Sequence, residues 1–410
     1  MPSGTASTQL ITKNLEASLF PLPIGYRYAA AHAGIRKDKR NDLALIVSDA
    51  TASAAGVFTK NLVQAAPVLL SKANLKASRG KASVIVVNAG NANCATRTGA
   101  KVALDTCKAV AKALRIPVEH VLPASTGVIG VEMDGSKLTS AMPSLVSSLG
   151  GDFESVAKAI LTTDLVPKRA AARLATKGGT VTLSGMTKGS GMIHPMMATT
   201  LGFVMTDAHL SPTDLKPMLQ RATARSFNRL SVDGDMSTND TIFLLANGAS
   251  GSALTVKEKL LFEEALTHLL EDLAIQIARD GEGATKLVTI DVAGTRTEAD
   301  AETIARAIAN SPLVKTATYG NDANWGRILA AAGYAGVKFD PAHVEIDMQG
   351  VTVCRGGLAA KFNEEELKYL LNTPDVRIDL RIQGKGKGRA RFFTCDFTEG
   401  YIKINASYRS

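Results

Sequence analysis

The chain has 410 residues, of which 45% are hydrophobic and 21% charged, as in a soluble globular protein of two or three domains. Its net charge of +9 permits nucleic-acid binding, but the charges are scattered and only 5% of the residues are aromatic. We therefore interpret the positive charge as attraction for small anionic substrates or as a source of solubility, and we expect no nucleic-acid partner. No run approaches the ~18 apolar residues of a membrane helix, and no signal peptide is evident, which predicts a cytoplasmic protein. The four cysteines do not have the spacing of metal ligands, so we expect free thiols.

The N-terminal half predicts alternating strands and helices. Apolar runs bounded by Asp, Ala and Gly predict short strands at 43–48 and 56–59 and a further strand at 83–87. A polar Asn/Gly loop at 88–93 and a helix over 99–114 follow, the helix with Val and Leu at helical spacing. This is the order of a phosphate-binding unit, but the Gly-x-Gly-x-x-Gly fingerprint is missing, so we do not expect a dinucleotide site.

A Ser-Thr-Gly sequence lies within the next apolar stretch, 121–130. In a turn, Ser125, Thr126 and Gly127 would present backbone N–H groups and a hydroxyl together, as stabilisation of a tetrahedral oxyanion requires. A plain turn is the alternative on the residues alone, because Ser, Thr and Gly commonly fill turns. A helix over 152–161 is predicted to follow.

The centre of the chain is a Gly-rich loop that leads into an apolar strand. It begins at Lys188 and becomes apolar over 201–205, with the pair Ala198-Thr199 at the junction. A hydroxyl residue at such a junction can attack the carbonyl that precedes it, which leaves an N-terminal Thr whose amine serves as its base. Because Gly-rich loops are also common turn chemistry, the residues alone leave an ordinary loop open.

Capping residues predict two helices in the next part of the chain, over 211–227 and from 255 to about 279. Between them lies a polar cluster, 233–241, which by composition either binds a metal or forms turns. No His or Glu completes a metal-ligand set in it. The cluster leads into an apolar strand at 242–246.

The last third of the chain also alternates strands and helices. A strand at 287–292 and a helix at 302–309 are followed by a strictly alternating strand at 376–382. The basic segment 384–391 is predicted to form a hairpin turn with solvated charges before a final strand. The tail, 401–410, alternates at first like a strand.

Five motifs together resemble the ornithine acetyltransferase family (ArgJ, glutamate N-acetyltransferase). They extend over most of the chain: STGVIG at 125–130, TTDLVPK at 162–168, KGSGMIHPMMAT at 188–199, DGEGATK at 280–286 and YIKINASYRS at 401–410. The central motif departs from the usual family pattern at Met196, where Asn is usual, and at Thr200, where Met is usual. The order Ala198-Thr199 is that of the family's self-cleaved bond.

The resemblance implies an α/β fold, a layered αββα sandwich of the ArgJ/DmpA-like type, in an autoprocessed N-terminal-nucleophile enzyme. Self-cleavage between Ala198 and Thr199 would yield an α chain, residues 1–198, with the oxyanion hole and the cleavage loop. The β chain, residues 199–410, would begin with the nucleophile and contain a C-terminal α/β domain. Both chains come from one precursor, and the implied assembly is an α2β2 heterotetramer.

The implied reaction is transfer of acetyl from N2-acetylornithine to L-glutamate in the cyclic pathway of arginine biosynthesis, by a ping-pong mechanism through acetyl-Thr199. It needs neither a metal nor a bound organic cofactor. One open point is acetyl-CoA as an additional donor, which would make the enzyme bifunctional as an amino-acid acetyltransferase. The alternative function is that of a related N-terminal-nucleophile aminopeptidase or amidohydrolase, in which water resolves the acyl-enzyme.

The resemblance also implies the residues of the site. Thr199 would be the nucleophile, and Thr126 and Gly127 the oxyanion hole. Lys188 would pair with a substrate carboxylate and Glu282 with a substrate ammonium group. The implied substrate-binding positions are Thr162, Lys188, Thr199, Glu282, Asn405 and Ser410.

Overall fold

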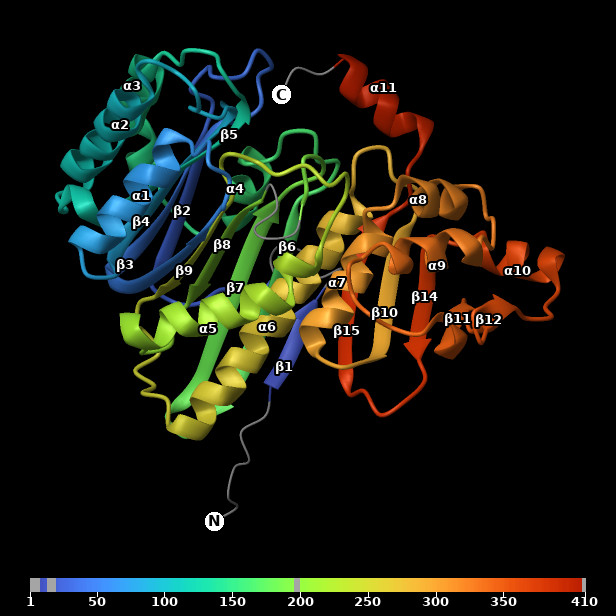
Figure 1. Cartoon of the computed structure of the whole chain (residues 1–410). Helices are drawn as coiled ribbons and strands as arrows, with labels where there is room; N and C mark the ends of the chain where they lie inside the picture. Colours follow the sequence, from blue (N-terminus) through green and yellow to red (C-terminus); the bar gives the residue numbers. More distant parts are fainter. Residues whose placement is uncertain (1–7, 13–19, 195–199, 408–410) are drawn as a thin grey trace.

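The computed structural model describes residues 8–12, 20–194 and 200–407, and these form two β-sheets with helices packed on them (Figure 1). The elements of the N-terminal part are β1 (Thr8–Thr12), β2 (Tyr26–Ala31), β3 (Leu43–Phe58), α1 (Ala66–Ala77), β4 (Lys81–Asn91), α2 (Gly99–Leu114), η2 (Val118–His120), β5 (Val121–Val128), α3 (Gly135–Ser147), α4 (Phe153–Ala159), β6 (Lys168–Thr176) and β7 (Gly179–Lys188). Those of the C-terminal part are β8 (Leu201–Thr206), α5 (Pro212–Arg225), η3 (Phe227–Arg229), β9 (Thr241–Ala246), α6 (Val256–Arg279), β10 (Leu287–Thr295), α7 (Glu298–Ala309), α8 (Pro312–Tyr319), α9 (Trp325–Gly333), η4 (Pro341–His343), β11 (Val344–Met348), β12 (Val351–Arg355), β13 (Leu358–Ala359), α10 (Glu364–Leu371), β14 (Asp375–Ile382), β15 (Gly388–Cys395) and α11 (Glu399–Ser407).

The larger sheet, which has nine strands within the described residues, bends back on itself at the long strand β3. Its strand order is β1-β6-β7-β8-β9-β3-β4-β5, and β2 also pairs with β3. The first part of β3 pairs with β2 and β4, the last part pairs with β9, and the register against β4 shifts between Val47 and Ala52. Tyr26 on β2 donates its hydroxyl to the carbonyl oxygens of Thr206 (3.0 Å) and Leu245 (2.9 Å). This contact joins β2 to β8 and β9, so the two parts of the sheet pack against each other.

The two parts of the larger sheet share an apolar core, which contains side chains of β2 to β5 together with side chains of β7, β8 and β9. Helices α1, α2 and α3 cover the outer face of the first part, and α5 and α6 cover the outer face of the second. Burial of these apolar faces stabilises the layers. The predicted αββα sandwich is therefore confirmed.

The smaller sheet has six strands within the described residues, in the order β13-β12-β11-β14-β10-β15. Its apolar face packs under α7, α8, α9 and α10. Val376, Ile378 and Leu380 of β14 are buried in this core, as the strict alternation of the sequence predicts. The opposite face carries charged side chains and lies toward α6.

Local capping sets the predicted helix ends. Ser211 and Asp214 form a capping box at the start of α5, and Thr255 and Glu258 form another at the start of α6. These reciprocal hydrogen bonds satisfy N–H groups that lack a partner inside the helix. The predicted bounds of α2 and α6 are confirmed. None of the helices in the described ranges combines the length and the apolar character needed to cross a membrane.

The two short strands predicted at 43–48 and 56–59 are one continuous strand, β3. Its middle residues, Asp49, Ala50 and Thr51, are exposed and coincide with the register shift against β4. The polar interruption in the sequence therefore marks a bulge in one strand, and the prediction of two strands is wrong.

Three further predictions are wrong, the first two because the structure depends on strand pairing between segments far apart in the chain. The Ser-Thr-Gly sequence lies in strand β5, paired with the end of β4, and not in a turn. The segment 384–391 does not close a hairpin, because β10 lies between β14 and β15 and pairs with both. The tail forms helix α11 instead of a strand, and Thr398 Oγ1 caps its start by accepting a hydrogen bond from the Gly400 N–H (3.0 Å).

Strands from both sides of the predicted cleavage point share the larger sheet. Strands β8 and β9, which follow it in sequence, lie between β7 and β3, which precede it. The predicted boundary at Ala198 and Thr199 lies outside the described residues, and the division into chains of 1–198 and 199–410 stays a prediction. Because the strands interleave, cleavage at this point would leave the two pieces paired within one sheet.

A buried ion cluster ties the start of β6 to the end of α6. Lys168 Nζ lies 2.7 Å from Asp164 Oδ1 and 2.5 Å from Asp280 Oδ2, and the three side chains are at most 7% exposed. Burial raises the pKa of Asp280. Burial acts in the same direction on Asp164, but the charges of Lys188 and Lys168 outweigh it and hold the pKa of that carboxyl well below its usual range. Such a cluster is stable only while its charges compensate one another.

The substitution Lys168→Met keeps the length of the side chain but removes the charge, which leaves two buried carboxylates without their shared cation. We expect a loss of about 3–5 kcal/mol in the free energy of unfolding at pH 7, measured by urea denaturation. Without the cation the pKa values of the two carboxyls rise in the folded state, so protonation relieves the penalty and the deficit should shrink as the pH falls from 7 to 5.

The matched control is Arg221→Met, which removes an exposed ion pair between α5 and α6, to Glu263. It should change the free energy of unfolding by no more than about 1 kcal/mol. A loss for Lys168→Met as small as that of the control would contradict the compensating role of Lys168.

Candidate active site

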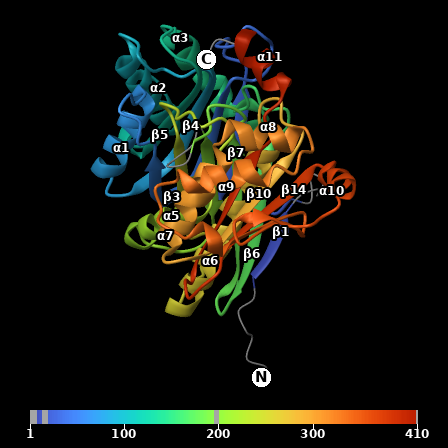
Figure 2. The same cartoon turned by 45° about the vertical axis from the view of Figure 1, so that its right-hand side comes forward.

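Residues from widely separated segments line a hollow of about 170 Å³. It lies at the ends of β4, β5 and β7 and next to the loop before β9, and α11 contributes to its wall. Both views show α11 at the top of the molecule, toward the end where β5 lies (Figure 1 and Figure 2). Every predicted catalytic or substrate-binding residue within the described ranges lines this hollow: Thr126, Gly127, Thr162, Lys188, Glu282 and Asn405.

The loop with the predicted cleavage bond begins and ends beside this hollow. Lys188, which lines the hollow, is the last residue of β7 and pairs with Leu201 at the start of β8. Thr200, just before β8, is buried. Four positions singled out by the sequence lie outside the described residues: Met196, Ala198, Thr199 and Ser410.

Thr126 and Gly127 lie where β5 runs against the end of β4. Gly127 has a φ of +129°, and a Cβ atom at this position would lie 2.3 Å from the carbonyl carbon of Gly90, so only glycine fits. Asn239, for which the sequence offered no signal beyond its polar surroundings, donates from Nδ2 to the carbonyl oxygen of Ser125 (2.8 Å). The strand end is therefore held in place, as a preorganised oxyanion site requires.

Lys188 is the cation of the hollow. Its side chain is 4% exposed, and its Nζ lies 3.9 Å from Asp164 Oδ2, beyond hydrogen-bond distance. Burial lowers the pKa of Lys188, although the charge of Asp164 opposes this shift. Because Asp164 already binds Lys168, Lys188 is placed to pair with an anion that enters the hollow.

Asp164 fixes two loops of the site through their backbone. Its carboxylate accepts hydrogen bonds from the N–H groups of Thr162 (3.0 Å) and Gly189 (2.6 Å). Thr162 belongs to the loop after α4, and Gly189 follows Lys188 in the Gly-rich loop. The two predicted substrate contacts Thr162 and Lys188 are thus positioned by one buried carboxylate.

Glu282 lies directly against Gly191. A Cβ atom on Gly191 would lie 2.2 Å from Glu282 Oε2, so the glycine is what allows the carboxylate into the hollow. The Glu282 N–H donates to the carbonyl oxygen of Ser190 (2.9 Å), and Glu282 Oε2 accepts a hydrogen bond from Asn405 Nδ2 (2.8 Å). Asn405 therefore reaches the hollow from α11, and its contact with substrate stays a prediction.

Two aspartates of the polar cluster before β9, Asp233 and Asp240, accept hydrogen bonds from backbone N–H groups, as turn-forming residues do. Asp233 accepts hydrogen bonds from Met192 (2.6 Å) and Ile193 (2.8 Å), and Asp240 accepts one from Thr200 (2.9 Å). Burial raises the pKa values of both carboxyls. The two aspartates hold the chain on both sides of the predicted cleavage bond, a role for which the acidic composition was the only signal in the sequence.

Charges of both signs line the hollow. Lys188 is a cation in its lining, and Glu282, Asp233 and Asp235 are acidic residues there. The Tyr401 hydroxyl donates to Asp233 Oδ2 (3.3 Å); burial, followed by the charge of Asp233, raises the pKa of this hydroxyl above its usual value. This distribution suits a ligand that carries both a carboxylate and an ammonium group.

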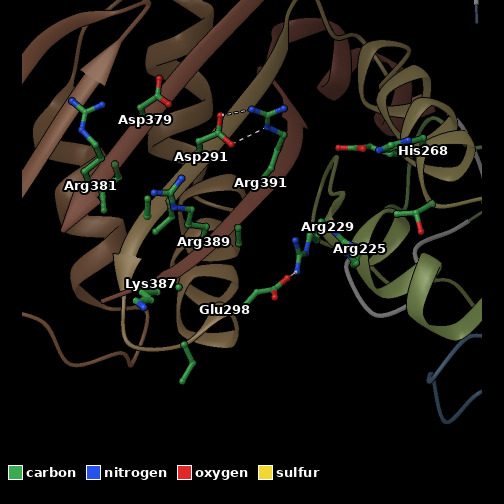
Figure 3. Close-up of a pocket in the computed structure, with 18 of the residues that line it drawn as sticks. Arg225, Arg229, His268, Asp291, Glu298, Asp379, Arg381, Lys387, Arg389 and Arg391 are labelled. Carbon is green, nitrogen blue, oxygen red and sulfur yellow. Dashed lines mark hydrogen bonds and ion pairs between the residues drawn. The ribbon is translucent and has the colours of Figure 1, made fainter. Parts of the chain in front are cut away.

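A second hollow, of about 1070 Å³, lies between α6 and the charged face of the smaller sheet (Figure 3). The basic residues of the segment 384–391 reach it mostly from strand β15. Figure 3 shows Arg391 paired with Asp291, at 2.8 and 2.9 Å, and Arg229 paired with Glu298. None of the predicted site residues within the described ranges lines this hollow, so the predicted chemistry belongs to the smaller one.

Comparison with known proteins gives a consistent picture. The model of the ArgJ family matches residues 27–410. The arginine biosynthesis bifunctional protein ArgJ of Nitratidesulfovibrio vulgaris is 46% identical over 394 residues, which cover 95% of this chain and 99% of that protein. The protein of the same name from Desulfotalea psychrophila is 45% identical over 392 residues, which cover 94% and 99%.

Two solved structures are also similar to the chain. The arginine biosynthesis bifunctional protein ArgJ of Bacillus halodurans has a TM-score of 0.49 at 40% identity and covers 50% of this chain and 98% of its own. The ornithine acetyltransferase of Mycobacterium tuberculosis, in complex with ornithine, has a TM-score of 0.41 at 32% identity and covers 46% and 98%.

The sequence relatives decide between the functions that the sequence left open, in favour of acetyl transfer over an aminopeptidase or amidohydrolase. The family model spans nearly the whole chain, and relatives at 45% and 46% identity match over 94% and 95% of it. The chain therefore belongs to the ArgJ family, the acetyltransferases of arginine biosynthesis.

Proposed function

We propose that this chain transfers acetyl from N2-acetylornithine to L-glutamate through an acetyl-enzyme formed on Thr199. The observation that carries the proposal is the hollow itself, which brings Lys188 and Glu282 together beside Thr126 and Gly127. One cation and one carboxylate in the same lining match a substrate with charges of both signs. Family membership supports the class of reaction.

In the first half-reaction the Thr199 oxygen attacks the acetyl carbonyl of N2-acetylornithine. The α-amine of Thr199, with a reference pKa of about 7.7–8.0, takes the hydroxyl proton, and Thr126 and Gly127 stabilise the oxyanion. The C–N bond then breaks, the proton passes to the departing nitrogen, and ornithine leaves. In the second half-reaction the glutamate amine attacks the acetyl-threonine ester, and its proton returns to the Thr199 oxygen.

The substrate-binding roles follow from the charges. Lys188 would bind the substrate carboxylate, and Glu282, supported by Asn405, would bind the ammonium group. Thr162 would contact substrate from the loop that Asp164 holds. Ser410 keeps its predicted role as a substrate contact near the end of the tail. No metal or organic cofactor takes part in these steps.

The Thr199 hydroxyl and the oxyanion hole would also cleave the chain before it meets substrate. The Thr199 oxygen would attack the carbonyl of Ala198, and the acyl group would shift from nitrogen to oxygen, which breaks the C–N bond and frees the Thr199 amine as its nitrogen takes up a proton. Water would then hydrolyse the ester, which releases the carboxylate of Ala198 and the hydroxyl of Thr199. The hydrogen bonds of Asp233 and Asp240 to the flanking backbone support this, because a reaction within one chain gains from fixed geometry. The products would be chains 1–198 and 199–410, which we propose assemble as an α2β2 heterotetramer that light scattering can test.

The function is tested by incubating the purified protein with N2-acetylornithine and L-glutamate. We expect acetylglutamate and ornithine in equal amounts; ornithine and free acetate without acetylglutamate would instead indicate hydrolysis. The curated relatives are named bifunctional, and we propose that acetyl-CoA can also load Thr199. Acetylglutamate formed from acetyl-CoA and glutamate, and abolished by Thr199→Ala, would establish the second donor.

Substitutions at the cleavage bond separate processing from catalysis. Thr199→Ala removes the nucleophile and should remain a single inactive chain of 410 residues. Thr199→Ser keeps a hydroxyl and should cleave and retain part of the activity, and Thr200→Ala should cleave normally. Intact-mass measurement and N-terminal sequencing of the second fragment check these outcomes. A fragment that begins at Thr200 would move the nucleophile by one residue.

Lys188→Met should weaken binding of both substrates, because it removes a charge-assisted hydrogen bond to their carboxylate. A lost bond of this type corresponds to roughly a tenfold to hundredfold rise in KM, with a smaller change in kcat if the contact is equal in ground and transition states. Lys259→Met is the matched control, since Lys259 pairs with Asp214 on the outer helices (2.9 Å) and lies outside the lining of the hollow. Equal kinetics in the two variants would remove Lys188 from the site.

A further inference from the structure

Asp233 joins three segments that are far apart in the sequence. Its Oδ2 atom accepts hydrogen bonds from the Met192 N–H (2.6 Å) and from the Tyr401 hydroxyl (3.3 Å). Its Oδ1 atom accepts them from the Ile193 N–H (2.8 Å) and the Asp235 N–H (3.2 Å). One carboxylate thus connects the loop before β9, the Gly-rich loop and the C-terminal helix α11.

Helix α11 depends on few contacts for its position. None of its residues is buried, so it lacks the apolar face that normally holds a helix on a protein. Its first residues pack on the backbone of Gly283. Beyond that packing, its side chains make the hydrogen bond from Asn405 to Glu282 (2.8 Å), the hydrogen bond from Tyr401 to Asp233 (3.3 Å) and a contact of the Tyr401 ring with Phe397, with centroids 4.7 Å apart. The loss of one polar contact should therefore move the helix, and with it Asn405.

The donor pattern around Asp233 requires a carboxylate. Three backbone N–H groups, of Met192, Ile193 and Asp235, and one phenol point at its two oxygens. An asparagine has one acceptor oxygen and one NH2 group, so one side of the amide would face an N–H group with no acceptor. An aspartate has acceptors on both sides, and the donors compensate for its partial burial.

We propose that Asp233 is a positioning residue that holds the Gly-rich loop and helix α11 in one fixed arrangement around the hollow. Through Met192 and Ile193 it fixes the segment that precedes the predicted cleavage bond. Through Tyr401 it sets the place of Asn405 beside Glu282. The inference rests on the proposed function for its two kinetic consequences, which are faster self-cleavage and tighter substrate binding. The positions of the Gly-rich loop and helix α11 do not depend on the proposed function.

The two arms of Asp233 can be removed separately. Tyr401→Phe removes the helix arm only, so we expect cleavage of the precursor at the wild-type rate and about a tenfold rise in KM for N2-acetylornithine, the effect of losing one hydrogen bond to a charged group, with kcat changed less than twofold. Asp233→Asn also removes the loop arm, so cleavage should slow about tenfold in addition. Asp233→Glu, which restores the acceptors, should recover part of the cleavage rate.

Asp340→Asn is the matched control. Asp340 also accepts a backbone hydrogen bond, from the Ala342 N–H (2.9 Å) at the start of η4, but it lies in the smaller sheet's part of the chain and does not line the hollow. This variant should lower the melting temperature as much as the loss of any helix-capping hydrogen bond does. The cleavage rate and the KM should stay at wild-type values. An equal effect of Asp340→Asn on cleavage or KM would overturn the inference, because general destabilisation would then account for it.

Hydrogen–deuterium exchange keeps the inference testable whatever the activity. In Asp233→Asn the segments 192–193 and 399–407 should exchange at least tenfold faster than in wild type, whereas in Tyr401→Phe only 399–407 should do so. If wild type makes no acetylglutamate, the proposed function fails while this exchange pattern still decides the inference. Unchanged exchange in both variants would overturn the inference, and so would an unchanged KM in an active Tyr401→Phe variant. If Asp233→Asn does not fold, the exchange and the KM of Tyr401→Phe decide the inference.

Discussion

The geometry of the site depends on the buried carboxylate of Asp164. It binds Lys168 Nζ (2.7 Å) and accepts hydrogen bonds from the N–H groups of Thr162 (3.0 Å) and Gly189 (2.6 Å). A buried charge without such partners costs several kcal/mol, so the segments that supply the donors must come together as the protein folds. Lys188, one residue before Gly189, is placed by the same requirement. The arrangement of the charged hollow is therefore a consequence of compensating one buried anion.

The sheet topology determines what cleavage of the chain would change. Strands β7 and β8 pair with each other, with Lys188 opposite Leu201, and β8 also pairs with β9. Asp233 and Asp240 hold the backbone on both sides of the predicted cleavage bond. Because these contacts and the strand pairing lie outside that bond, a cut there would leave β7 and β8 paired with each other and β8 paired with β9. Cleavage at this point is therefore compatible with the pairing of the sheet.

What the sequence predicts correctly is local. The capping box of α6 and the alternation along β14 depend on residues a few positions apart, and both lie where predicted. The continuity of β3 and the place of β10 between β14 and β15 depend on distant contacts that periodicity does not contain. The tail forms a helix that Thr398 caps, and Thr398 precedes the alternating residues from which a strand was predicted. The site shows the same distinction. Lys188 and Glu282 line one hollow, as the family resemblance implies. The roles of Asp233 and Asp240 were not predicted. Each carboxylate binds backbone N–H groups, which every residue except proline has, so no residue type in the sequence marks its partner.

The size and polarity of the hollow favour a small substrate with charges of both signs. A volume of about 170 Å³ is below that of pockets for drug-sized ligands, and the opposite charges of Lys188 and Glu282 suit the carboxylate and the ammonium group of an amino acid. Two glycines keep this space open. A Cβ atom at Gly191 would lie 2.2 Å from Glu282 Oε2, and one at Gly283 would lie 2.3 Å from the backbone nitrogen of Tyr401. Gly191 leaves room for the carboxylate of Glu282, and Gly283 lets α11 approach. The loop that carries Glu282 therefore determines both the polarity of the hollow and the position of the C-terminal helix.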